Sequence, residues 1–348
     1  MVDFAIGVLG AFFKPAPQLC LTKTGSGSVH LNTDIRVAVG GVLRKYTSGS
    51  PITMPILTAG TDYAIYACAD GTLRASANFT APDGYTTLNS RHFGGFHYAA
   101  GGNATGTTGG NTTPAINEYS LWDLKWRPAC PDPRGMALVA GNFWCDIYML
   151  GVNHHADGTS RNNVTIADGS SPPKVPSSFG GNGSDVYSNF TWFNASEVMK
   201  SHGKSLLDYA EFAAATYGAT ENQSRGDDPV TTGLGTTNSG LSNTDEEQTS
   251  KWGIIQATGC LLAWGRDLQY YAAGADFAAL IAFAYKNQTG SRGQIYAQNT
   301  SGISAALFGG NWLYGANSGS RASTWSLAPW NSSSSLGARG RSDHLCHG

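Results

Sequence analysis

Cysteines and histidines are the side chains of this 348-residue chain best suited to redox, nucleophilic or metal chemistry. The six cysteines stand at irregular separations and form no Cys-x-x-Cys pair, which argues against a zinc site and a dense disulfide framework. We therefore predict buried free thiols. His154 and His155 are expected on a strand, where neighbouring side chains point to opposite faces. This arrangement predicts one packed and one exposed histidine and no shared metal site.

Acidic residues gather in the irregular stretch 218–249, as Asp227-Asp228 and as the run from Asp245 to Glu247. Carboxylates can bind calcium, and loops of this length are commonly functional or disordered. Because no regular ligand spacing is present, solvated loop charges are the favoured interpretation and a calcium site is the alternative. We expect no cofactor. The tripeptide Arg225-Gly226-Asp227 matches an adhesion motif, but three residues match by chance in a glycine-rich chain.

Short strands and turns must position these residues in the first half of the chain. The stretches 35–39 and 42–46 flank Gly40-Gly41, which is suited to a two-residue hairpin turn. A second hairpin is predicted to turn at Asp70-Gly71 after the apolar stretch 63–68. Several short strands at this spacing indicate a β-sandwich, and a cluster of prolines near residues 127–133 indicates where it ends.

The second half combines strands with two short helices. A strand region is predicted around Trp144, which is expected to be buried. Asn194 with Glu197 three residues later predicts a capped helix start, and Asp208 with Glu211 repeats the pattern. We therefore expect an α+β fold that is mostly β.

Composition restricts the partners of the chain. The formal net charge is −2 and only 13% of residues are charged, so no basic surface is expected for nucleic acid or for an anionic membrane. Residues 5–13 form an apolar stretch that is too short to span a bilayer and lacks a basic leader. We interpret it as an N-terminal strand or an attachment to another protein. We expect synthesis in the cytoplasm without a signal peptide and without membrane insertion.

The region from about residue 305 to residue 348 shows a different pattern. Glycine, arginine and tryptophan anchors are spaced along it, and mostly small polar residues fill the gaps without an apolar period. This pattern indicates a contact surface on a rigid scaffold. Trp312 and Trp325 are expected to pack beneath the surface, and Arg321 and Arg339 to hold its loops by hydrogen bonds to carbonyls or carboxylates. Trp330 stands among small polar residues and is expected to be an exposed binding hot spot.

This region resembles the variable region of C-type-lectin-like proteins that retroelements diversify, and specifically that of the phage major tropism determinant family. The likeness continues through long strings and covers roughly residues 17–348. These strings are 53–55, 57–66, 94–99, 116–123, 132–136, 150–154 and 249–253. Members of the family carry an additional N-terminal domain, whereas about sixteen residues of this chain precede the start of the likeness.

The resemblance implies three parts. Residues 1–16 are a short N-terminal assembly segment that contacts other tail-fibre proteins, residues 17–127 a β-sandwich domain, and residues 128–348 a C-type-lectin-like domain with a variable region at about 305–348. It also implies a homotrimer in the virion, at the tip of a phage tail fibre, that binds a receptor on the bacterial surface, most simply a protein.

The resemblance and the spacing pattern together predict the site residues. The variable, ligand-binding residues are Asn311, Leu313, Tyr314, Ala316, Asn317, Ser323, Thr324, Ser326, Leu327, Trp330, Asn331, Ser332, Ser334 and Ser335. The scaffold residues are Gly309, Gly310, Trp312, Gly319, Arg321, Trp325, Gly337 and Arg339. Adenine mutagenesis of an asparagine codon reaches Ser, Thr, Tyr, Leu, Ala, Gly and Asp, a set that contains most of the variable residues but not tryptophan.

Other functions are open at this point. A prophage-encoded or cell-encoded surface protein diversified by a retroelement would have the same pattern. Residues 259–264 and 309–312, with Arg321, also resemble the formylglycine-generating-enzyme branch of this fold, which implies an oxidase. That chemistry needs paired cysteines near the C-terminal strands, and residues 309–340 contain none. A calcium-type lectin needs Glu-Pro-Asn or Gln-Pro-Asp, and neither tripeptide occurs. We therefore expect a binding protein and not an enzyme.

Overall fold

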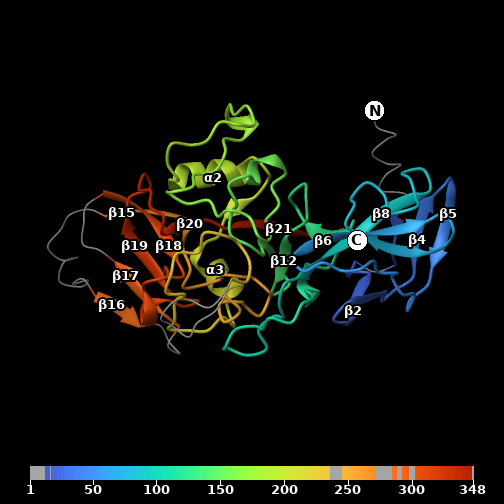
Figure 1. The fold of residues 1–348 in the computed structure, drawn as a ribbon, viewed down its shortest axis with the longest axis horizontal. Helices are drawn as coiled ribbons and strands as arrows, with labels where there is room; N and C mark the ends of the chain where they lie inside the picture. Colours follow the sequence, from blue (N-terminus) through green and yellow to red (C-terminus); the bar gives the residue numbers. More distant parts are fainter. Residues whose placement is uncertain are drawn as a thin grey trace.

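The computed structural model describes residues 12–15, 17–235, 245–271, 284–287, 292–297 and 302–346. Regular structure in these residues is mostly β-strand with two α-helices, in agreement with the expected mostly β class. Figure 1 shows an elongated molecule in which β4 (Ile35–Val39) and β5 (Val42–Tyr46) lie at one end, β15 to β19 (between residues 262 and 327) lie toward the other, and β21 (Gly340–Cys346) returns to the middle. Most of the predicted assembly segment 1–16 lies outside the described residues.

Small antiparallel sheets form the N-terminal end of the molecule. One sheet contains β1 (Phe12–Phe13), β4 (Ile35–Val39) and β5 (Val42–Tyr46), and another contains β2 (Leu21–Gly25) and β3 (Ser28–Leu31). The predicted hairpin is therefore confirmed as β4 and β5. Its turn residues Gly40 and Gly41 have φ angles of 59° and 76°, a conformation that residues with a Cβ rarely adopt.

A sheet of ten strands joins the two halves of the chain. Its strands are β6 (Thr61–Cys68), β7 (Leu73–Ser76), β8 (Ser90–Ala99), β9 (Ala115–Ile116), β10 (Trp122–Asp123), β11 (Trp126–Pro128), β12 (Met136–Val139), β13 (Phe143–Asp146), β14 (Ser205–Leu206) and β21 (Gly340–Cys346). The β6–β7 pairing confirms the second predicted hairpin. Val37 of β4 shares a hydrophobic cluster with Ile65 and Phe93 of this sheet. The sheet continues across residue 127, where the domain division was predicted, and that division stays a prediction.

Two short helices follow on the chain. Helix α2 (Trp192–Lys200) has Thr191 as its N-cap, because the Thr191 hydroxyl accepts from the Asn194 N–H and the Asn194 side chain accepts from the Thr191 N–H. The prediction that Asn194 caps this helix is wrong, since Asn194 is the reciprocal partner inside the first turn. Helix α3 (Tyr209–Ala215) begins at Asp208 as predicted, with Glu211 completing the capping box.

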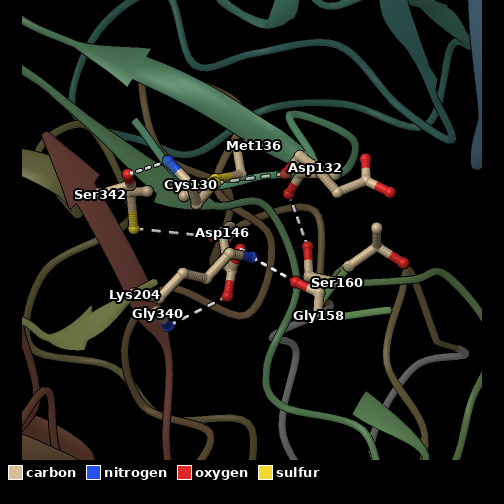
Figure 2. Close-up of polar contacts among 12 residues, drawn as sticks. Cys130, Asp132, Met136, Asp146, Gly158, Ser160, Lys204, Gly340 and Ser342 are labelled. Carbon is tan, nitrogen blue, oxygen red and sulfur yellow. Dashed lines mark hydrogen bonds and ion pairs between the residues drawn. The ribbon is translucent and has the colours of Figure 1, made fainter. Parts of the chain in front are cut away.

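A buried ion pair connects the C-terminal strand to the middle of the chain (Figure 2). Lys204 Nζ donates to Asp146 Oδ1 at 2.5 Å and to the Gly158 carbonyl at 2.6 Å. The other Asp146 oxygen accepts from the Gly340 N–H at 3.1 Å. Both charged side chains are at most 1% exposed. An uncompensated buried charge costs several kcal/mol, so Lys204 stabilises the buried Asp146 carboxylate. Asp146 in turn joins the end of β13 to the start of β21 through its hydrogen bond from Gly340.

His154 and five cysteines are buried in the described part of the chain. His154 and His155 lie in a 3-10 turn, so the expected strand is wrong, although His154 is buried as one of the pair was predicted to be. Burial lowers the pKa of His154 well below its ordinary value. Cys20, Cys68, Cys130, Cys145 and Cys260 are buried and free, as predicted. Within the described part of the chain, no helix has the length and apolar character needed to cross a membrane.

Candidate functional site

A six-stranded sheet carries most of the C-terminal region. Its order is β16 (Ala284–Asn287), β17 (Gln294–Ala297), β19 (Ser323–Leu327), β18 (Gly302–Phe308), β15 (Leu262–Tyr271) and β20 (Leu336–Gly337). Leu307 packs in the cluster that includes α2, and Phe308 packs in the cluster that includes α3, so the C-terminal part of β18 is buried on both faces. After β20 the chain enters β21 of the ten-stranded sheet, and the region is therefore anchored in both sheets.

The loop between β18 and β19 is held by residues that the sequence analysis did not single out. Ser224 Oγ donates to the Trp312 carbonyl at 2.8 Å and accepts from the Gly315 N–H at 3.0 Å. Glu221 accepts from the backbone N–H and from the hydroxyl of Ser320 at 2.9 and 2.6 Å. No local pattern marks Glu221 and Ser224, because their partners lie 88 to 99 positions later in the sequence.

Exposure divides the predicted ligand-binding residues into three groups. Leu313, Ala316 and Trp330 are exposed. Tyr314, Asn317, Ser326, Leu327, Asn331, Ser332, Ser334 and Ser335 are partly exposed. These two groups together are called the contact face below. Asn311, Ser323 and Thr324 are only 7, 3 and 6% exposed, so their expected place on the surface is wrong.

Backbone pairing explains the burial of these three residues. Ser323 and Thr324 begin β19, where they pair with β17 on one side and with β18 on the other. Ser323 Oγ accepts from Trp325 Nε1 at 3.0 Å. Asn311 Oδ1 accepts from the Leu313 N–H at 3.0 Å and so shapes the turn that presents Leu313. The three small polar side chains support the contact face from below.

Trp330 stands at a turn that is fixed to α2. The Trp192 N–H donates to the Pro329 carbonyl at 3.0 Å, and the Phe190 N–H donates to Ser332 Oγ at 3.0 Å. The turn is therefore tied down on both sides of Trp330, whose side chain is 63% exposed. An exposed tryptophan on a tethered turn combines a large apolar contact area with a small loss of entropy on binding.

Arg339 makes the carbonyl contacts predicted for a scaffold arginine. Its Nη1 donates to the carbonyls of Asp146 and Ile147 at 2.9 and 2.7 Å, and its Nη2 to those of Ile255 and Gln256 at 2.7 and 3.2 Å. The side chain is 1% exposed. One planar fork thus joins two chain segments beneath the C-terminal region.

Arg321 does not have the same role. Among the described residues, no hydrogen-bond acceptor contacts its guanidinium, and the side chain lines a surface hollow together with Tyr209, Tyr217 and Arg292. The prediction of a loop-holding fork is therefore wrong for Arg321, whose hydrogen bonds are made by its backbone: the N–H donates to the Arg292 carbonyl at 2.9 Å, and the carbonyl accepts from the Tyr209 hydroxyl at 3.4 Å.

The remaining scaffold residues are buried or half-buried. Gly309, Gly310, Gly319 and Gly337 are buried. Gly310 has a φ of 80°, and a Cβ there would lie 2.3 Å from Ser318 Oγ. Trp312 packs against Met149, and Trp325 packs edge-on against Phe308 with ring centroids 6.4 Å apart. Both tryptophans thus contact the hydrophobic interior.

Arg225 forms ion pairs with one aspartate from each acidic cluster. Arg225 Nε donates to Asp245 Oδ1 at 2.9 Å and its Nη1 to Asp227 Oδ1 at 2.6 Å. Asp245 is 1% exposed, so the expectation of solvated charges is wrong for this residue. In the chain segments that the structure describes, no group of three or more His, Cys, Asp or Glu side chains is arranged for a metal ion. Burial raises the pKa of the Cys260 thiol well above its ordinary value, which makes it a poor nucleophile.

Comparison with known proteins finds relatives of this chain in both sequence and structure. A family model described as the Mtd second domain matches residues 19–123. The tail fiber receptor-binding protein of Bordetella phage BPP-1 is 51% identical over 337 residues, which are 96% of this chain and 85% of that protein. The solved structure of the Major Tropism Determinant I1 Variant superposes with a TM-score of 0.85 at 52% identity, over 97% of this chain and 86% of that chain. The U1 Variant superposes with a TM-score of 0.84 at 51% identity, over the same shares.

Proposed function

This chain belongs to the phage major tropism determinant family of tail-fibre receptor-binding proteins, and we propose that it selects the bacterial host by binding a protein receptor on the cell surface. The observation that carries the proposal is sequence identity to a receptor-binding protein across nearly the whole chain. We also propose that the protein belongs to a tail fibre of the virion and that it acts by binding, without catalysis.

We propose the contact face as the receptor-binding surface. Leu313 and Trp330 are 72 and 63% exposed and supply its apolar contacts, while the small polar residues around them supply hydrogen bonds. The scaffold below depends on Arg339, Glu221 and Ser224, none of which belongs to the face. Substitution at exposed positions usually costs within about 0.5 kcal/mol. A retroelement can therefore diversify the face without unfolding the protein.

The finer organisation is also a proposal. We assign residues 17–127 to a β-sandwich domain and 128–348 to a C-type-lectin-like domain, and infer a homotrimer. Small side chains make single contacts weak, and three copies of the face would raise avidity by roughly 10²–10⁴ through effective concentration. Light scattering of the purified protein should give the mass of three chains. A monomer at micromolar concentration would refute the trimer.

The binding surface is tested with the double variant Leu313→Ala and Trp330→Ala. We expect adsorption to host bacteria to fall at least tenfold, since loss of a hot-spot residue costs about 2 kcal/mol or more, while the melting temperature stays within about 1 °C. The matched control is Leu88→Ala, because Leu88 is 83% exposed but belongs to the N-terminal half. Full adsorption by the double variant, or loss of adsorption in the control, would show that the face is misassigned.

A further inference from the structure

A hollow of about 540 Å³ opens next to the loop that carries the contact face. It is lined by Tyr209, Ala210, Ala213, Ala214, Tyr217, Arg292 and Arg321. The floor is the outer side of α3, whose inner side packs Phe212 against Phe308 with ring centroids 5.2 Å apart. Because the outward side chains at the centre of this helix are alanines, the floor is low and the larger tyrosine and arginine side chains form the walls.

Two arginines enter the hollow from adjacent backbone. The Arg321 N–H donates to the Arg292 carbonyl at 2.9 Å, which joins the two residues at their main chains. The Arg292 guanidinium lies 5.1 Å from the centroid of the Tyr217 ring, a cation–π contact that orients it. Neither guanidinium has a hydrogen-bond or ion-pair partner among the residues that the structure describes. Both forks therefore keep their N–H donors available to a ligand.

One carboxylate lies near these arginines and is already engaged. Burial raises the pKa of Glu221, whereas the hydrogen bonds from Ser320 and the positive charges of Arg292 and Arg321 act in the opposite direction. Both Glu221 oxygens accept from Ser320, at 2.9 and 2.6 Å. Among the described residues, the two guanidinium charges thus act on Glu221, each of whose oxygens already accepts one hydrogen bond from Ser320. The described residues that line the hollow include two arginines and no carboxylate, in a chain whose overall formal charge is −2.

We propose that this hollow is an anion-binding subsite that receives a carboxylate from an acidic side chain of the receptor, an inference that rests on the proposed receptor-binding function. Planar guanidinium forks bind a carboxylate through parallel N–H···O bonds. The two tyrosines flank the bound group, and the alanine floor leaves room for a side chain to enter. Neither arginine belongs to the contact face, so the subsite supplies a constant contact while the residues of the face vary.

The subsite is tested without any bacterial cell by titrating the full-length protein with sodium glutarate at constant ionic strength and following thermal unfolding. A ligand that binds only the folded state raises the melting temperature in proportion to ln(1 + [L]/Kd). We expect this rise for the wild type and its loss in the double variant Arg292→Gln and Arg321→Gln. The control is Arg36→Gln, which removes an exposed arginine of β4 at the far end of the molecule (Figure 1) and should retain the rise.

Two further arms make the result decisive. Inorganic phosphate is titrated in parallel, and binding of phosphate without binding of glutarate would overturn the carboxylate assignment. Host-cell adsorption of the double variant should fall roughly tenfold, since two partly exposed charge pairs are worth up to about 1 kcal/mol each. A glutarate response that survives in the double variant, or the absence of any response in the wild type, would overturn the subsite. Failure of the wild type to adsorb to bacteria would instead refute the receptor function, and the glutarate titration would still decide on the anion site.

Discussion

Replacing Arg339 by methionine tests whether one buried fork supports the whole C-terminal region. The substitution removes donors from four carbonyls, of which those of Ile255 and Gln256 have no other donor among the described residues. Both residues are at most 2% exposed. An unsatisfied buried polar group costs about 1–3 kcal/mol, whereas loss of the buried charge itself returns some desolvation energy. We therefore expect the free energy of unfolding to fall by about 3–5 kcal/mol.

This loss can be measured by urea unfolding followed through circular dichroism. With an unfolding entropy of about 2.1 cal/mol/K per residue, it corresponds to a fall in melting temperature of roughly 4–7 °C. Arg321→Met is the matched control, because it makes the same chemical change at an arginine without a hydrogen-bonded guanidinium, and it should cost less than about 0.5 kcal/mol. Equal losses of unfolding free energy in the two variants would refute the conclusion that Arg339 stabilises the fold through its hydrogen bonds whereas Arg321 does not.

Three further predictions concern the scaffold. Burial holds the folded-state pKa of His154 well below 6.5. Below about pH 6.5 the unfolded chain therefore binds more protons than the folded chain, and the free energy of unfolding falls as the pH is lowered. The urea midpoint of His154→Leu should change less between pH 7.5 and pH 5 than that of the wild type, and equal changes would count against this. Asp208→Ala removes the N-cap of α3 and should lower the free energy of unfolding by about 1 kcal/mol in the same assay, and an unchanged midpoint would contradict the cap. Gly310→Ala should cost about 1–3 kcal/mol, because φ is 80° and the new Cβ would meet Ser318; a midpoint equal to that of the wild type would disprove the strain.

Local signals in the sequence predicted the elements whose ends are decided locally. The Gly40-Gly41 turn and the Asp208 cap each depend on residues within a few positions, and both are present. The start of α2 was mispredicted because Thr191 and Asn194 both fit a capping pattern. A distant contact decides between them: the Trp192 N–H donates to the Pro329 carbonyl at 3.0 Å, which fixes the chain at the first turn. Where α2 begins therefore cannot be predicted from its local sequence alone, because it also depends on this tertiary contact.

The two arginines of the C-terminal region show the same limit more sharply. Arg321 and Arg339 both stand between small residues and close to glycine, and no local feature separates them. Arg339 reaches carbonyls that lie between 83 and 193 positions away, whereas Arg321 turns toward α3. Resemblance to a family predicts where the variable region lies, but the role of each arginine depends on which distant segments pack beneath it.

The contact face itself shows why polarity is a poor guide to exposure in this chain. Small hydroxyl side chains can be buried at low cost when a neighbour satisfies them, as the Trp325 indole satisfies Ser323. Ser323 and Ser334 therefore look alike in the sequence, although one lies within a paired strand and the other is partly exposed. A larger residue at position 323 would have to displace a packed neighbour, which costs about 1–3 kcal/mol, and position 334 carries no such constraint. We therefore expect diversification that keeps the fold to be concentrated at Leu313 and the partly exposed residues of the contact face, and we expect the buried polar positions to fix the shape of the surface on which that diversity is displayed.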